Sequence, residues 1–151
     1  MKNFINKCLI FGLMLCGVVF LQACDLSHKH YEDKYGICQS CGKDTAELLT
    51  PNSNQEFISS EKFGRENDFV YFKFVSLGEE FINITVTEIS GKVNYVELYS
   101  KTTSNLYLSH MSGENVYCHE SPLTQGETYY IRVRLLKAGN VKISVSPFVE
   151  S

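Results

Sequence analysis

Residues 81–89 read FINITVTEI, and this stretch decides the fold class. Its inner residues set an apolar row against a polar row, namely Ile82, Ile84 and Val86 against Asn83, Thr85 and Thr87. Successive side chains of a β-strand point to opposite faces, so a period of two predicts a strand with one buried face. Isoleucine, valine and threonine are also residues that strands favour.

The same alternation of apolar and polar residues recurs on both sides of this stretch, from residue 55 to the end of the chain. Further alternating or aromatic runs are DFVYFKFV (68–75), VNYVELYS (93–100), NLYLSH (105–110), NVYCHE (115–120), TYYIRVRLL (128–136) and VKISVSPF (141–148). Turn signals separate the runs, and no amphipathic helix lies among them. This pattern predicts an all-β domain over residues 55–151, an antiparallel β-sandwich of jelly-roll-like type.

Alternation also predicts which side chains line the core of that domain. If every run keeps its period of two, the inward residues are Val70, Phe72, Phe74, Ile82, Ile84, Val86, Val96, Leu98, Tyr129, Ile131, Val133, Ile143 and Val145. The order of the strands in the sheets does not follow from this pattern.

The start of the chain has the features of a secretory signal. Lys2 and Lys7 form a short positive region, and residues 8–21 are all apolar or glycine. These 14 residues span only about 21 Å as a helix, short of the ~30 Å hydrocarbon core of a bilayer. We therefore expect a signal peptide over residues 1–23, with a single membrane-spanning helix as the alternative.

The end of this segment, Leu21-Gln22-Ala23-Cys24, resembles the lipobox of bacterial lipoproteins. The resemblance implies cleavage between Ala23 and Cys24, a diacylglyceryl thioether on Cys24, and acylation of the new amino group. In lipoproteins of the enteric type, an aspartate such as Asp25 in the next position implies retention in the inner membrane. The alternative is an ordinary cysteine beyond a plain signal-peptidase site. We expect a lipid-anchored protein that faces the periplasm or the cell exterior.

Residues 24–54 are polar and aperiodic, and we expect a flexible tether there. Removal of residues 1–23 takes away two lysines and no acidic residue, so the net charge changes from −3 to −5. A mildly acidic chain without a cluster of basic residues argues against nucleic acid as a partner.

The tether contains Cys38-Gln39-Ser40-Cys41, and a further cysteine, Cys118, lies in the domain. Two thiols at this spacing suit either half of a zinc site or a disulfide. His28, His30 and the Cys118-His119 pair are the other candidate ligands. An oxidising compartment favours a disulfide, and the pairings 38–41, 38–118 and 41–118 stay open. Cys118 also suits a small buried apolar side chain. We expect no cofactor and no bound metal.

The order of the runs, with GETYYIRV at residues 126–133, resembles the bacterial pre-peptidase C-terminal domain. The resemblance covers residues 55–147 and implies a small β-sandwich with an accessory role in binding or spacing, without catalytic residues. The aspartate-rich stretch of that family is replaced here by KVNYVELY at residues 92–99, so calcium binding is not carried over.

Nothing in the chain matches a catalytic motif of the common hydrolases, nucleotide-binding enzymes or zinc proteases. His110 and His119 fall at strand ends or in loops, where we expect solvated side chains. We therefore expect a non-catalytic envelope lipoprotein whose domain binds an envelope protein or a glycan, or acts as a spacer. The alternative is a secreted carbohydrate-binding accessory module. Six tyrosines could stack on sugar rings in such a module, although tyrosines in strands more often pack against neighbouring side chains. They are Tyr95, Tyr99, Tyr107, Tyr117, Tyr129 and Tyr130.

Overall fold

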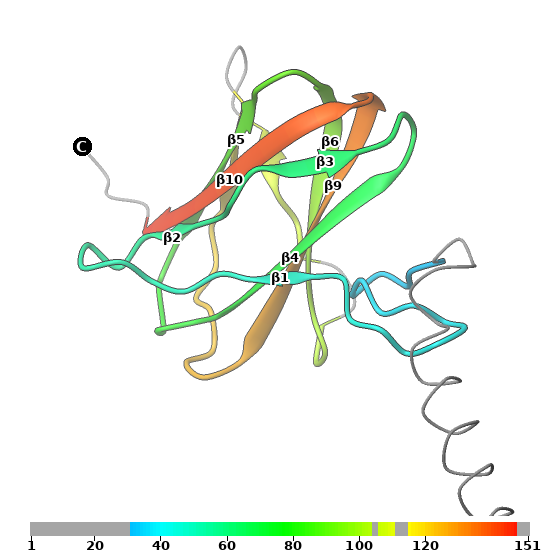
Figure 1. Ribbon diagram of the computed structural model, residues 1–151. Coiled ribbons are helices and arrows are strands. Elements are labelled where there is room, and N and C mark those ends of the chain that lie inside the picture. The colour runs from blue at the N-terminus through cyan, green and yellow to red at the C-terminus, as the bar shows by residue number, and fades with distance from the viewer. Residues whose placement is uncertain (1–30, 104–105, 111–114, 148–151) are drawn as a thin grey trace, which may run out of the picture.

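The computed structural model describes residues 31–103, 106–110 and 115–147. Within these ranges every regular element is a β-strand, and the strands form two sheets that enclose one core (Figure 1). This confirms the predicted all-β sandwich. The expected signal peptide of residues 1–23, the lipobox-like stretch that ends at Cys24, and the histidines at positions 28 and 30 lie outside the described residues. No helix in the described ranges has the length and apolar character needed to cross a bilayer.

The smaller sheet has the strand order β1-β4-β9-β6. Its strands are β1 (Glu47–Leu48), β4 (Phe69–Val75), β9 (Thr128–Lys137) and β6 (Lys92–Ser100). The β4–β9 and β6–β9 pairs are antiparallel, as expected, whereas the two-residue strand β1 runs parallel to β4. At the centre, Ile131 of β9 lies between Phe72 of β4 and Leu98 of β6.

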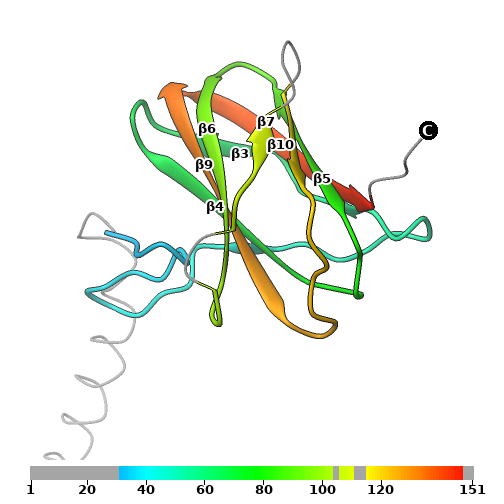
Figure 2. The same ribbon diagram turned by 180° about the vertical axis from the view of Figure 1, so that it is seen from behind.

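The larger sheet has the order β2-β10-β5-β8-β7, and β3 also pairs with β10. Its strands are β2 (Phe57–Ile58), β3 (Lys62–Gly64), β10 (Gly139–Pro147), β5 (Ile82–Glu88), β8 (Val116–His119) and β7 (Ser109–His110). All of its pairs are antiparallel. The stretch FINITVTEI thus supplies β5, which pairs with β10 on one side and with β8 on the other. Figure 2 shows β5 and β10 from behind.

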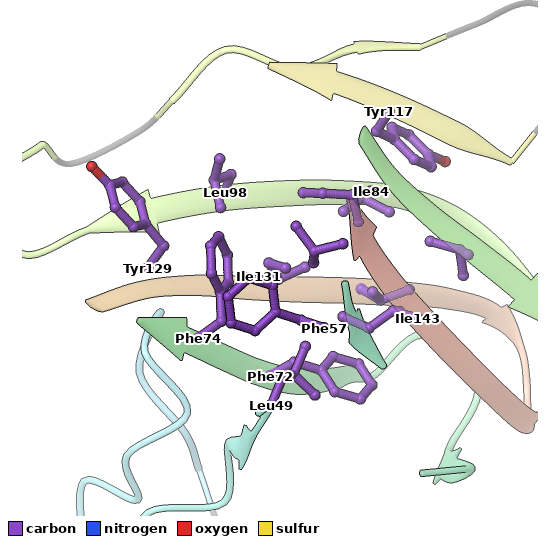
Figure 3. Close-up of a cluster of buried hydrophobic side chains, with 14 of the residues drawn as sticks. Leu49, Phe57, Phe72, Phe74, Ile84, Leu98, Tyr117, Tyr129, Ile131 and Ile143 are labelled. Carbon is purple, nitrogen blue, oxygen red and sulfur yellow. The ribbon is translucent and has the colours of Figure 1, made fainter. Parts of the chain in front are cut away.

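The core lies between the two sheets (Figure 3). All 13 residues predicted from alternation are buried in it. Residues that alternation did not single out complete the cluster: Leu49, Phe57, Tyr117, Leu123, Leu135 and Val141. Several of these come from strands of two residues or from loops, where no period can be read.

Strand β6 is an edge of the smaller sheet, and its ladder with β9 is irregular at its start. Val93 and Tyr95 are two residues apart, but their partners Leu135 and Arg134 are adjacent. Asn94 is therefore an extra residue, as in a β-bulge. Farther along the strand, Leu106 bridges to Leu98.

The described part of the expected tether packs against the sandwich. Residues 31–46, here called the N-terminal clasp, form a small hairpin-like unit with bridges between Glu32 and Cys38 and between Ile37 and Asp44. Beyond it, β1 joins the smaller sheet and Leu49 is buried in the core. The packed unit therefore starts well before residue 55, because short pairings together with single side-chain contacts hold this polar segment on the smaller sheet.

Candidate binding face

The outer surface of the smaller sheet carries an unusual set of side chains. Because Ile131 and Val133 of β9 point into the core, their neighbours Arg132 and Arg134 point away from it. The same parity on β4 and β6 gives the remaining members. We call this set the arginine–aromatic face: Phe69, Tyr71, Tyr95, Glu97, Tyr99, Tyr130, Arg132 and Arg134.

Arg132 is fixed at the middle of this face. Its guanidinium lies 4.6 Å from the ring centroid of Phe69 and 5.0 Å from that of Tyr99, both within cation–π range. Its Nε donates to the carboxylate of Glu97, and about a fifth of each side chain is exposed. Burial alone would raise the pKa of Glu97, but hydrogen bonds from Arg132 and Tyr99 and the nearby guanidinium charges lower it. The charge of Arg132 is thus largely balanced within the protein.

Arg134 is held less completely. Its guanidinium lies 5.6 Å from the ring of Tyr95 and 5.9 Å from that of Phe69, and Nη1 donates to the Tyr95 hydroxyl at 3.4 Å. Its Nε is shielded from solvent, yet no atom of the described residues accepts a hydrogen bond from it. A buried donor without an acceptor is costly and uncommon in folded proteins. That buried Nε is not itself open to an external group, but Arg134 as a residue is only half-buried and its charge has no ion-pair partner among the described residues. Its guanidinium therefore suits an external anion, because guanidinium groups pair well with carboxylates and phosphates.

Most tyrosines of this face are covered by neighbouring side chains rather than exposed to solvent. Tyr71, Tyr99 and Tyr130 are buried, whereas Phe69 and Tyr95 are half-buried. Burial raises the pKa of Tyr71 to about 12, with the charge of Glu32 as the next cause. Burial and the Glu97 hydrogen bond raise the pKa of Tyr99 to about 12. These phenols are neutral structural groups at physiological pH.

The N-terminal clasp covers one part of the same face. The ring of Tyr35 meets that of Tyr130 edge-on at 4.9 Å, and the ammonium of Lys34 lies 5.5 Å from the ring of Tyr99. Asp44 forms an ion pair with Lys73 of β4. The clasp thus lies on the outer side of the smaller sheet, next to the arginines.

The structure separates the cysteines predicted as a disulfide or metal site. Cys118 is buried on the outer side of the larger sheet, where its Sγ donates to Asn83 Oδ1 at 2.9 Å. Cys38 and Cys41 lie in the clasp, on the outer side of the other sheet. A disulfide needs Cα atoms within about 7 Å, and the two sheets lie between Cys118 and the clasp, which argues against the pairings 38–118 and 41–118. The pairing 38–41 stays a prediction. The interpretation of Cys118 as a small buried side chain agrees with its burial.

The histidines differ from one another. His110 is exposed in β7, as expected, and its ring lies 4.7 Å from that of Tyr117. His119 was expected to be solvated, and that expectation is wrong, because it is buried with Nδ1 2.8 Å from the carbonyl oxygen of Tyr107. Across residues 31–103, 106–110 and 115–147, no group of three or more His, Cys, Asp or Glu side chains is placed to hold a metal ion.

Comparison with known proteins supports the assigned fold and nothing more specific. No protein family matches the chain, and no curated protein matches its sequence. The structure is similar to PliG of Aeromonas hydrophila, a periplasmic inhibitor of g-type lysozyme, with a TM-score of 0.51 and 10% identity over 68% of this chain and 95% of that one. It is also similar to the pre-peptidase C-terminal domain of a Bacillus anthracis collagenase, with a TM-score of 0.52 and 15% identity over 79% of this chain and all of the other. The fold implied by the resemblance to pre-peptidase C-terminal domains is confirmed.

Proposed function

We propose that this chain is a non-catalytic lipoprotein of the bacterial envelope whose sandwich binds an anionic partner through the arginine–aromatic face. Residues 1–23 would be removed, and acylated Cys24 would anchor the protein to a membrane, facing the periplasm or the exterior. The observation that carries the binding role is Arg134, a half-buried arginine beside Tyr95 and Phe69 whose charge has no ion-pair partner among the described residues.

The geometry around Arg134 supports an anion more than a neutral ligand. Arg132 already has Glu97 as its partner, so the positive charge not balanced within this face is that of Arg134. Phe69 lies beneath both guanidinium groups and limits their movement. A pre-positioned guanidinium loses little side-chain entropy when an anion binds.

The contacts of Glu97 and Tyr99 on this face favour a binding role over a catalytic one. Glu97 is held in an ion pair with Arg132 and its pKa is lowered, while burial and the Glu97 hydrogen bond raise the pKa of Tyr99 to about 12. General acid–base catalysis near neutral pH needs a group whose pKa lies near the working pH. These shifts move Glu97 and Tyr99 away from that range.

Anchoring is tested directly on Cys24. Cys24→Ala should abolish incorporation of labelled fatty acid and release the protein from membranes or leave it uncleaved. Intact-mass analysis of membrane-extracted protein should give a chain that starts at residue 24 and carries acyl groups. An unmodified Cys24 in that material would refute the anchor.

Anion binding is tested by following the arginine side chains in solution. The chain has three arginines, Arg65, Arg132 and Arg134, so the Nε–H region of a ¹⁵N spectrum holds three signals. In the purified lipidated protein in detergent, added acetate or inorganic phosphate should shift the Arg134 signal, while exposed Arg65 reports the nonspecific effect of salt. Equal shifts of Arg65 and Arg134 would refute the site.

A protein target is the second candidate, and its support is the fold shared with the Aeromonas hydrophila inhibitor. The direct test is the activity of a g-type lysozyme with and without an excess of the purified protein. A carbohydrate-binding role has less support, because four of the six candidate tyrosines, Tyr99, Tyr117, Tyr129 and Tyr130, are buried.

A further inference from the structure

We propose that the anionic partner of the arginine–aromatic face is the phosphate layer of the membrane that holds Cys24, so that the sandwich lies with this face toward the bilayer. The inference rests on the proposed anchoring of Cys24 and names the partner of the same face. It differs from the expectation that a flexible tether over residues 24–54 holds the domain away from the membrane.

The first argument is the length of chain between the anchor and the packed unit. The clasp begins at Tyr31, whose carbonyl oxygen accepts a hydrogen bond from the Gln39 amide at 3.0 Å. Only residues 25–30 lie between Cys24 and this point. Fully extended, they bring the Cα atoms of Cys24 and Tyr31 no more than about 25 Å apart. A domain of this size is roughly 35 Å across, so the anchor holds it at the membrane surface.

The second argument is where the chain leaves the domain. The clasp lies on the outer side of the smaller sheet, with Tyr35 against Tyr130 and Gly36 against Tyr71. Figure 1 and Figure 2 both place the clasp and the C-terminal end of β10 on opposite sides of the sandwich. The short connection to Cys24 therefore starts on the same face that carries the arginines.

The third argument is the chemistry of the two outer surfaces. Around the clasp lie Arg132 and Arg134, with Phe69 and Tyr95 half-buried beside them. Arginine suits phosphate groups, and aromatic side chains with one polar end are favoured at head-group depth. The outer surface of the larger sheet instead carries mainly short polar side chains along β5 and β10, with one lysine and no arginine among them: Asn83, Thr85, Thr87, Lys142, Ser144 and Ser146.

The charge of the mature chain, −5, would oppose long-range attraction to an anionic membrane. The anchor removes that difficulty, because a tethered face meets head groups at an effective concentration in the millimolar range or above. A contact too weak to recruit a soluble protein is then strong enough to orient an anchored one. We accordingly expect no stable vesicle binding without the acyl chains.

The test uses the absence of tryptophan from the chain. Phe69→Trp places a single fluorophore on the arginine–aromatic face, and Phe63→Trp places one on the opposite surface, where Phe63 of β3 is 63% exposed. The lipidated variants are reconstituted in vesicles of phosphatidylethanolamine and phosphatidylglycerol, with nitroxide on a fraction of the head groups. Quenching should be several-fold stronger for Phe69→Trp after correction for accessibility to acrylamide.

Two further variants keep the result interpretable. Arg134→Gln in the Phe69→Trp background should remove at least half of the excess quenching while leaving the circular dichroism spectrum unchanged. Insertion of about 30 Gly/Ser residues between positions 30 and 31 leaves the fold intact and should also reduce the excess, since the effective concentration falls with tether length.

Equal quenching at both positions, or stronger quenching of Phe63→Trp, would overturn the proposal. So would a Phe69→Trp signal that ignores the nitroxide lipids but responds to a glutamate-rich peptide, because the face would then serve an acidic protein segment. Failure of the underlying function looks different. Loss of co-flotation with vesicles would refute the anchor, and an Arg134 Nε–H signal that phosphate does not shift would refute the anion site.

Discussion

Gly36 of the clasp lies directly against the side chain of Tyr71 in β4. A Cβ atom at position 36 would come within 2.8 Å of the Cβ and Cγ atoms of Tyr71, and the glycine has a φ of +78°. The close approach requires both the missing side chain and the left-handed backbone that glycine tolerates. This contact joins the segment nearest the proposed anchor to the sheet that carries the arginines.

Gly36→Ala should therefore destabilise the clasp by about 2–4 kcal/mol, from backbone strain plus steric overlap. Gly42→Ala is the matched control, because Gly42 has a φ of +70° but no atom near the position of a Cβ. The control should lose only about 1 kcal/mol from the strain. Thermal unfolding, together with proteolysis within residues 31–46, measures both. Similar losses for the two variants would contradict the packing contact.

Ile84→Asp should destabilise the domain by about 3–5 kcal/mol, because Ile84 is fully buried in the core and an unpaired carboxylate would be left there. Thr85→Asp, one residue along β5 and on its outer side, is the control and should cost less than about 1 kcal/mol. Urea unfolding followed by circular dichroism gives both values. A stable Ile84→Asp protein would refute the assigned core.

Glu97→Gln should lower stability at neutral pH by an amount that disappears in acid. Burial opposes ionisation of Glu97, but Arg132 and Tyr99 lower its pKa below the reference value of 4.5. The unfolded chain then binds the proton more tightly, so the contribution is fully present above pH 4.5 and is lost as pH falls through the folded pKa. Urea midpoints of wild type and variant should converge in that acidic range. A constant difference at all pH values would contradict the ion pair.

Tyr71→Phe should make the protein more resistant to alkali. Burial, followed by the charge of Glu32, raises the pKa of Tyr71 from 10 to about 12. Stability from the neutral phenol is fully present below pH 10 and is lost as pH rises from 10 toward 12, because the unfolded tyrosine ionises first. Unfolding midpoints measured across that interval should fall less steeply for the variant. Parallel curves would mean that Tyr71 is not buried.

Cys118 should resist alkylation by iodoacetamide in the native protein at pH 8. Its side chain is buried, and burial, with a smaller effect of the Glu120 charge, raises the pKa of the thiol. The thiolate is the reactive form, so reaction should become fast only in urea. Peptide mapping without reduction tests the pairing at the same time. A disulfide between Cys118 and either cysteine of the clasp would contradict the separation of the two outer faces.

The strands with long alternating runs could be predicted from sequence, and their partners could not. The parity of Ile82, Ile84 and Val86 fixes their burial whatever lies beside them. That β9 lies between β4 and β6 depends on pairs of residues that lie 29 to 65 positions apart, from Ser100–Tyr129 to Phe69–Arg134, which no local pattern encodes. The two-residue strands β1, β2 and β7 have no period at all.

The candidate face was present in the sequence as an overlooked signal. In TYYIRVRLL, Arg132 and Arg134 alternate with Ile131 and Val133, so both arginines had to point away from the core. Their position relative to Phe69 and Tyr95 required the register of three strands. The clasp was missed because Gly36 and Tyr35 hold it through single contacts with distant rings.

The bulge at Asn94 has a consequence for a protein that is anchored to a membrane as we propose. Anchored molecules share a two-dimensional film, where neighbouring copies collide often and an open sheet edge invites end-to-end stacking into ribbons. On β6 the extra residue breaks the regular spacing of free amide and carbonyl groups in the first half, and the Leu98–Leu106 bridge occupies part of the second. Neither half of β6 therefore offers a long, regular row of free backbone groups with which the edge of another molecule could pair.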